Sequence, residues 1–242
     1  MSDSRLKAGA RRLMFKNAPR LFLISAVFVV VIAIMSEFEY RLLGIGDAYT
    51  QYIEQIAAGE PHSFSAFLDY LTPIGAALAL ILWLVSGVVE VGFTSVCLKT
   101  TRGFGGDYMD IFNAFFFLTK TLLIIIITST LTLLWGLLFF FPGIAAHYRY
   151  RLARYILIDD PSKSVLECIR ESKRIMSGNK LDLFLLDLSF IGWILLSVLL
   201  DMLLSQTFSL EFQIPLVSIW LSPYVGITCA KFYNRLLSKI AV

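Results

Sequence analysis

The chain has 242 residues, of which 57% are hydrophobic and only 16% are charged, and its mean hydropathy is +0.75. Soluble domains usually have about 45–50% apolar and about 25% charged residues, so this composition excludes an ordinary soluble protein and indicates an integral membrane protein. The net charge of +3 is small, and it does not suggest binding to nucleic acid.

Residues 1–20 are predicted to form a cytoplasmic amphipathic helix, because apolar and basic side chains recur there with helical spacing. Such a helix lies in the membrane interface, where each basic residue near anionic headgroups contributes about 1 kcal/mol. The apolar positions are Leu6, Ala10, Leu13 and Met14, and the basic positions are Arg5, Lys7, Arg11, Arg12 and Lys16. A first span follows over 21–35, with a continuation past Phe38 as the alternative, and because no small-residue cleavage site comes after it, we expect this span to be retained.

Residues 37–72 are predicted to form an external loop, because acidic residues outnumber basic ones there and basic residues are retained on the cytoplasmic side. The acidic residues are Glu37, Glu39, Asp47, Glu54, Glu60 and Asp69, against the single basic residue Arg41. A second span is expected over 73–98. Lys99 and Arg102 place its end in the cytoplasm, and the glycine-rich segment 103–106 is expected to form a turn.

The segment that follows the third span decides the topology. This third span, over 115–141, is the most apolar part of the chain, and it is expected to break at Pro142-Gly143. If 142–180 were one external loop, many basic residues would lie outside, which the positive-inside bias disfavours. These residues are Arg149, Arg151, Arg154, Lys163, Arg170, Lys173, Arg174 and Lys180. We therefore predict that 144–158 returns across the membrane as a short fourth span.

Residues 159–180 are predicted to form a cytoplasmic amphipathic elbow helix. The sequence Asp160-Pro161-Ser162 is typical of a helix start, and Gly178-Asn179 is typical of a helix end. The expected apolar stripe consists of Val165, Leu166, Ile169 and Met176. A structural connection between two spans is the favoured interpretation, and a helix that binds a partner is the alternative.

Two more spans, over 181–204 and 215–237, complete the pattern. Six spans place every loop on the side that its charges favour, whereas five spans leave one end on the wrong side. The predicted fold is therefore all-α, an integral membrane helical bundle of about six transmembrane helices with amphipathic interfacial helices. It is a single polytopic domain over 1–242, with both termini in the cytoplasm.

The last half of the chain resembles a known family over 112–233. The matching residues are Pro142-Gly143-Ile144, Tyr148, Tyr150, Tyr155-Ile156-Leu157, Asp160-Pro161, Ser172, Met176, Gly178 and the run from Leu183 to Trp193. On these residues the chain resembles a bacterial family of polytopic membrane proteins known as domain of unknown function number 975. The resemblance implies a multi-span bacterial membrane protein, and it implies no reaction.

Sequence signatures of an enzyme or a cofactor site are missing. The two histidines, His62 and His147, are far apart, and there is no His-Glu-x-x-His, Gly-x-Ser-x-Gly or nucleotide-binding loop. The three cysteines, Cys97, Cys168 and Cys229, are too widely spaced for a metal motif and offer no disulfide framework. We therefore predict no enzymatic activity, no catalytic residues, no metal and no cofactor.

Charged residues inside predicted spans are the best candidates for a functional site, because a charge in the membrane is costly. On a helix, His147, Arg151 and Arg154 share one face at i, i+4 and i+7, while Arg149 points elsewhere. With Glu90 and Asp187 as counter-charges, they are predicted to line a polar cavity for an anionic headgroup. The alternative is a structural network of buried ion pairs with arginines that extend to the interface.

The favoured function is that of a non-enzymatic bacterial inner-membrane protein that holds a lipid headgroup or an amphiphile, with anionic phospholipids as its partners. The alternative is a small-solute transporter or channel that uses Glu90 and a hinge at Pro223, a residue that can kink the sixth span. An intramembrane hydrolase based on Glu90 or Asp187 is less favoured.

Overall fold

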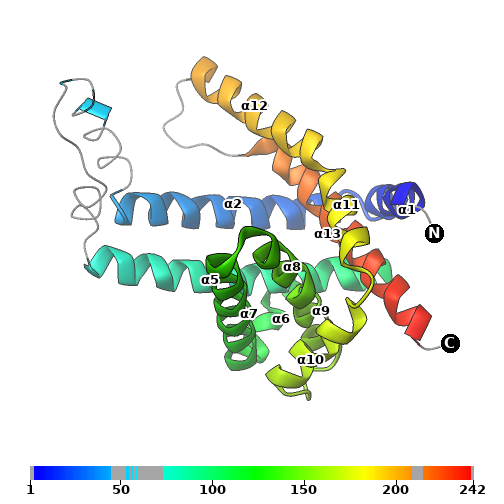
Figure 1. Cartoon of the computed structure of the whole chain (residues 1–242). Helices are drawn as coiled ribbons and strands as arrows, with labels where there is room; N and C mark the ends of the chain where they lie inside the picture. The colour runs from blue at the N-terminus through cyan, green and yellow to red at the C-terminus, as the bar shows by residue number, and fades with distance from the viewer. Residues whose placement is uncertain are drawn as a thin grey trace. The chain divides into compact units, whose positions relative to one another are not determined.

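The computed structural model describes residues 3–44, 53, 54, 56, 58, 73–208 and 215–240, and every regular element among them is a helix (Figure 1). The prediction of an all-α fold is therefore confirmed for this part of the chain. The predicted external loop over 37–72 lies mostly outside the described residues, except for its first residues, which are helical.

By its internal contacts the chain divides into two compact units, one comprising 1–29 with 87–242 and the other 30–86. The second unit contains the end of α2 (Arg20–Leu42) and the beginning of α5 (Pro73–Thr101). Helix α2 continues beyond the predicted end of the first span, and Glu37 accepts a hydrogen bond from Arg41 one turn later at 2.7 Å. Such an i,i+4 pair stabilises a helix, so the helix extends into the segment that was expected to be loop.

After α5 the chain folds back through a short 3₁₀ helix, η1 (Tyr108–Phe112). A capping box formed by Asp107 and Asp110 starts this helix. The return brings η1 against Gly92 of α5, where a Cβ atom would lie 1.8 Å from the carbonyl oxygen of Ile111. Only a residue without a side chain permits this approach, so Gly92 determines how closely η1 packs on α5.

Helices α6 (Asn113–Phe116), α7 (Leu118–Leu138) and α8 (Phe140–Tyr150) follow, and α7 and α8 lie side by side (Figure 1). The chain reverses at Phe139, whose φ of −158° and ψ of 143° are those of an extended residue. The predicted break at Pro142-Gly143 is therefore wrong by a few residues. Pro142 lies in the first turn of α8, where its missing N–H is no loss, and Gly143 allows α8 to approach Gly136 of α7.

The returning segment is two helices and not the single helix predicted over 144–158. Helix α8 ends at Tyr150, a turn follows, and α9 (Ala153–Asp159) continues. Both helices pack against α7. The returning segment therefore runs along α7 with a break at Arg151.

The two ends of this hairpin are tied together by Lys120, near the start of α7. Its ammonium group donates hydrogen bonds to the carbonyl oxygens of Pro161, Ser162 and Lys163, at 2.5, 3.2 and 3.1 Å. The segment after α9 thus lies beside the start of α7.

Helix α10 (Val165–Ile175) is the predicted elbow helix, and it begins a few residues later than expected. Asp160 instead closes a turn by accepting hydrogen bonds from Ser162, and the capping box at the helix start is formed by Ser164 and Glu167. The predicted stop is confirmed, because Gly178 has a φ of +81°. Leu166 was wrongly assigned to the apolar stripe, since it is 61% exposed. The buried face consists of Val165, Cys168, Ile169, Ser172 and Ile175.

Three helices complete the chain: α11 (Lys180–Leu188), α12 (Ile191–Phe208) and α13 (Leu216–Ile240). Helix α12 packs against α13. The carboxylate of Asp201 lies near the backbone N–H groups of Leu216 and Val217, at the start of α13.

The amphipathic helix at the N-terminus, α1 (Asp3–Lys16), packs against α13. Its apolar residues Leu6, Ala10 and Met14 are buried there. The stripe that was expected to face the membrane therefore faces protein. The side chains left on the exposed face include Arg5, Arg11, Arg12 and Lys16.

Four helical segments among the described residues are long and apolar enough to cross a membrane. They are Arg20–Leu42, Ile74–Thr101, Leu118–Leu138 and Lys180–Leu204. These helices support the prediction of a membrane protein. The number of six spans is not confirmed, because α8 and α9 are each short and α13 is not among the four segments.

We predict that Gly92→Ala destabilises the protein by about 1–3 kcal/mol, because the new methyl group overlaps the backbone of η1. Thermal unfolding of the purified protein in detergent measures this change as a lower Tm. Gly192→Ala is the matched control, since a Cβ atom there meets no atom within 4 Å. Equal Tm values for the two variants would contradict the close packing of η1 on α5.

Candidate functional site

A single carboxylate, that of Asp159, joins the ends of three helices. Its two oxygens accept hydrogen bonds from Arg102 at 2.6 and 2.8 Å, and one of them also accepts from the hydroxyl of Tyr233 at 2.8 Å. Asn234 accepts from Arg102 at 3.1 Å and donates to the hydroxyl of Thr101 at 2.8 Å. The end of α5, the end of α9 and the last turns of α13 are thereby fixed to one another. We refer to this cluster of five residues as the Asp159 anchor.

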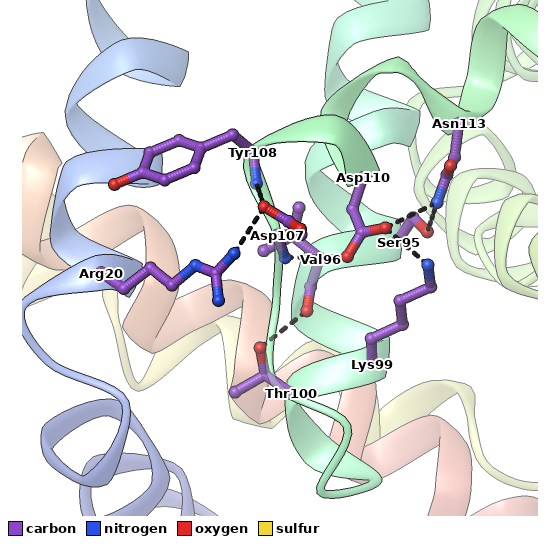
Figure 2. Close-up of polar contacts among 9 residues, drawn as sticks. All are labelled: Arg20, Ser95, Val96, Lys99, Thr100, Asp107, Tyr108, Asp110 and Asn113. Atoms are coloured by element: carbon purple, nitrogen blue, oxygen red, sulfur yellow. Dashed lines mark hydrogen bonds and ion pairs between the residues drawn. The ribbon is translucent and has the colours of Figure 1, made fainter.

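A second polar cluster fixes the turn that follows α5 (Figure 2). Arg20, at the start of α2, donates to Asp107 at 2.6 Å, and Lys99 donates to Asp110 at 2.5 Å. The hydrogen bond from Arg20, and next that from the backbone of Tyr108, lower the pKa of the Asp107 carboxyl below its usual value. The glycine-rich turn is therefore held by these ion pairs, which agrees with the prediction of a plain turn.

Arg151, in the break between α8 and α9, forms an ion pair with Asp187 of α11. The hydroxyl of Tyr148 donates to the same carboxylate at 3.0 Å, and a second nitrogen of Arg151 lies 3.6 Å from the sulfur of Cys229. Both partners of the ion pair are largely buried, at 23% and 22% exposure. A buried arginine needs such compensation, because an unpaired charge in an apolar bundle is costly.

Arg154, one turn further along, pairs with Glu90 of α5 at 2.9 Å. The arginine side chain is 27% exposed and the glutamate 56%. The pair is therefore more open than the one between Arg151 and Asp187. Glu90 comes from the first half of the chain, so the fold joins two distant segments at this point.

His147 completes the predicted set, and its ring stacks edge to face on Tyr148 with the centroids 5.4 Å apart. It makes no hydrogen bond within the described part of the chain. The structure pairs Arg151 with Asp187 and Arg154 with Glu90, and His147 lies with both arginines around one cavity. That these residues bind a ligand stays a prediction.

Two cavities open on either side of the two arginines, and Arg151 and Arg154 line both. The first, which we call the α5 cavity, has a volume of about 300 Å³ and includes Glu90. The second, the α7 cavity, has a volume of about 320 Å³ and includes His147. The other residues of the α5 cavity are Phe28, Phe93, Thr94, Tyr155, Ser218, Leu221, Ser222, Val225, Gly226 and Cys229. The other residues of the α7 cavity are Thr128, Ser129, Thr132, Leu133 and Tyr150.

Arg149, the third arginine of the returning segment, lines neither cavity. Its backbone carbonyl accepts a hydrogen bond from Ser172 of α10 at 2.9 Å. This position agrees with the helical geometry, which placed Arg149 away from Arg151 and Arg154.

Sequence reasoning missed the Asp159 anchor. Asp159 was not singled out from the sequence, and Arg102 was considered only as a cytoplasmic charge. No local signal links residues so far apart in the chain. Among the described residues, no group of three or more His, Cys, Asp or Glu side chains is placed to hold a metal ion.

Comparison with known families covers the second half of the chain. Residues 121–239 match the family model described as Protein of unknown function (DUF975). This part of the chain belongs to that family. No curated protein and no solved structure matches the chain.

The DUF975 region extends from α7 into α13, and it contributes His147, both cavity-lining arginines and Asp187. Glu90 and Arg102 lie outside the matched residues. The Asp159 anchor and the α5 cavity therefore combine the DUF975 region with the end of α5.

We predict that Asp159→Asn destabilises the protein by about 1–2 kcal/mol, because the charge that holds Arg102 is lost in a partly buried position. The control is Glu37→Gln, which breaks an exposed pair within α2 and should cost less than about 0.5 kcal/mol. Thermal unfolding in detergent compares the two variants. A Tm for Asp159→Asn as high as that of the control would mean that the anchor does not stabilise the fold.

Proposed function

We propose that this DUF975 protein is a non-enzymatic bacterial inner-membrane protein whose helices form a polar site for a lipid headgroup or an amphiphile. In this proposal the chain forms one polytopic domain of about six transmembrane segments, and both termini are cytoplasmic. Anionic phospholipids are the expected partners.

The positions of the helix ends support six alternating segments. Helices α5, α9 and α13 all end near the Asp159 anchor. The ion pair of Arg20 with Asp107 joins the start of α2 to the turn after α5. The hydrogen bond from Lys120 to Pro161 joins the start of α7 to the segment after α9. Helix α11 also begins near the end of α13, where Asp182 lies 3.8 Å from Arg235. These contacts join three helix starts and three helix ends, as six segments of alternating direction would require.

The charges at these helix ends support their assignment to the cytoplasm. Basic residues flank the helix ends there, and basic residues accumulate on the cytoplasmic side of inner-membrane proteins. The basic residues near these helix ends include Lys99, Arg102, Lys120, Lys163 and Arg235. The opposite end, where Asp201 lies near the start of α13, would then face outward.

The observation that carries the functional proposal is the pair of arginines, Arg151 and Arg154, lining two cavities in an apolar helical protein. An arginine guanidinium has five N–H donors, and one ion pair uses only some of them. The remaining donors are suited to the phosphate oxygens of a headgroup. The exposed basic residues of α1 would add an attraction to anionic lipid at the cytoplasmic surface.

A transporter or channel is the second candidate, and the α5 cavity is the observation that favours it. Glu90 lines this cavity together with Ser218 of α13, and Pro223 follows within α13. A proline inside a helix removes a backbone hydrogen bond and provides a place to bend. Movement of α13 at this position would open or close the cavity.

We predict that anionic phospholipid copurifies with the protein and that Arg154→Ala reduces its amount several-fold, because a charged hydrogen-bond donor to phosphate contributes about 1.5–3 kcal/mol. Native mass spectrometry of the purified protein measures the retained lipid. Arg149→Ala is the matched control, since Arg149 lines neither cavity, and it should retain the lipid.

Equal lipid retention in the two arginine variants would contradict the proposed site. Solute flux into proteoliposomes that disappears with Glu90→Gln would instead support the transporter. An enzyme would require turnover that is lost with Asp187→Asn.

We predict that a single cysteine at Ser162 is labelled only from the cytoplasmic side and one at Ser205 only from the outside, because six segments place these positions on opposite sides. The background replaces Cys97, Cys168 and Cys229 with alanine. Labelling with a membrane-impermeant maleimide is compared between intact cells and opened cells, to measure the side from which each cysteine is accessible. Labelling of Ser162 in intact cells would overturn the six-segment topology.

A further inference from the structure

The two cavities differ in the charges that line them. Glu90 lines the α5 cavity and holds Arg154 there. Among the described residues, no carboxylate lines the α7 cavity, which Arg151 and Arg154 share with polar side chains of α7 and α8. The polar side chains are Thr128, Ser129, Thr132 and His147. An anion therefore meets fewer negative charges in the α7 cavity than in the α5 cavity.

The α7 cavity also offers unused hydrogen-bond donors. Arg154 contacts Glu90 through one terminal nitrogen, and its other N–H groups make no hydrogen bond within the described part of the chain. The hydroxyl of Ser129 and the ring of His147 likewise have no hydrogen-bond partner there. By contrast, the hydroxyls of Thr128 and Thr132 already donate to helix carbonyls, at 2.6 and 2.7 Å.

We propose that a phosphate group binds in the α7 cavity, to Arg154, Ser129 and His147, and that it competes with Glu90 for Arg154. The inference rests on the proposed function and makes it more specific, because it selects one cavity and names the group bound. The Glu90 pair is the more exposed of the two ion pairs, so it is the one that a ligand exchanges most easily. Asp187 keeps Arg151 neutralised while this exchange takes place.

If the phosphate competes with Glu90, a change at Glu90 and changes in the α7 cavity should alter phosphate affinity in opposite directions. Glu90→Gln removes the competing charge, and we expect phosphate binding to tighten by about threefold, since an exposed pair is worth about 0.2–1 kcal/mol. Ser129→Leu fills the α7 cavity, and we expect binding to weaken by about tenfold or more. His147→Phe keeps the ring without its N–H group and should weaken binding severalfold.

The experiment titrates the full-length protein in detergent with dioleoyl phosphatidylglycerol, followed by native mass spectrometry, and separately with inorganic phosphate, followed by calorimetry. Tighter binding of the lipid identifies a headgroup as the source of the phosphate. Tighter binding of the inorganic ion identifies a soluble phosphate. The variants should show the same order of affinities with whichever probe binds.

Ser222→Leu is the matched control, because it makes the same chemical change in the α5 cavity, and it should leave phosphate affinity unchanged. If Ser129→Leu does not fold, His147→Phe and Glu90→Gln decide the question. Weaker binding in Glu90→Gln, or loss of affinity in Ser222→Leu but not in His147→Phe, overturns the choice of the α7 cavity while the proposed function stands. A wild-type protein that binds neither probe overturns both.

Discussion

The fold depends on one carboxylate at a point where three helices end. Asp159 accepts hydrogen bonds from Arg102 and Tyr233, and Asn234 completes the cluster. Charged hydrogen bonds are stronger in a partly buried position than in water, so this contact constrains the helix ends more than apolar contacts alone. A hydrogen bond is favourable only within a narrow range of length and angle, so it adds a directional constraint to the packing of the helices. The Asp159 anchor therefore sets the register in which α5, α9 and α13 lie.

That register brings the cavity-lining arginines to their partners. Arg154 is less than two turns from Asp159 on α9, and the anchor on α5 leaves Glu90 within its reach. The break between α8 and α9 places Arg151 toward Asp187. Each arginine has one carboxylate and more donors than that carboxylate uses, so donors remain for the anion that we propose. This combination of neutralised charge and spare donors is the reason why we propose a binding role.

Much of the site was predictable, because it depends on local helical geometry. His147, Arg151 and Arg154 line one cavity as their spacing predicted, because Arg151 and Leu152 keep helical backbone angles between α8 and α9. Their counter-charges could be chosen because membrane segments contain few carboxylates. Helix boundaries were less predictable. The sequence predicted the reversal of the chain at Pro142-Gly143, whereas it occurs at Phe139. Proline is a strong turn signal in general, but it is tolerated in the first turn of a helix.

The sequence by itself determined that the chain is a helical membrane protein, because composition and long apolar runs reflect the solvent that the chain meets. It also determined which ionisable groups need partners, because an unpaired charge is costly in any arrangement. Only the tertiary structure decided that Asp159 anchors three helices, that Gly92 admits η1 and that the apolar stripe of α1 faces α13. These features arise from contacts between residues distant in the chain, where the choice of partner depends on packing and not on local spacing.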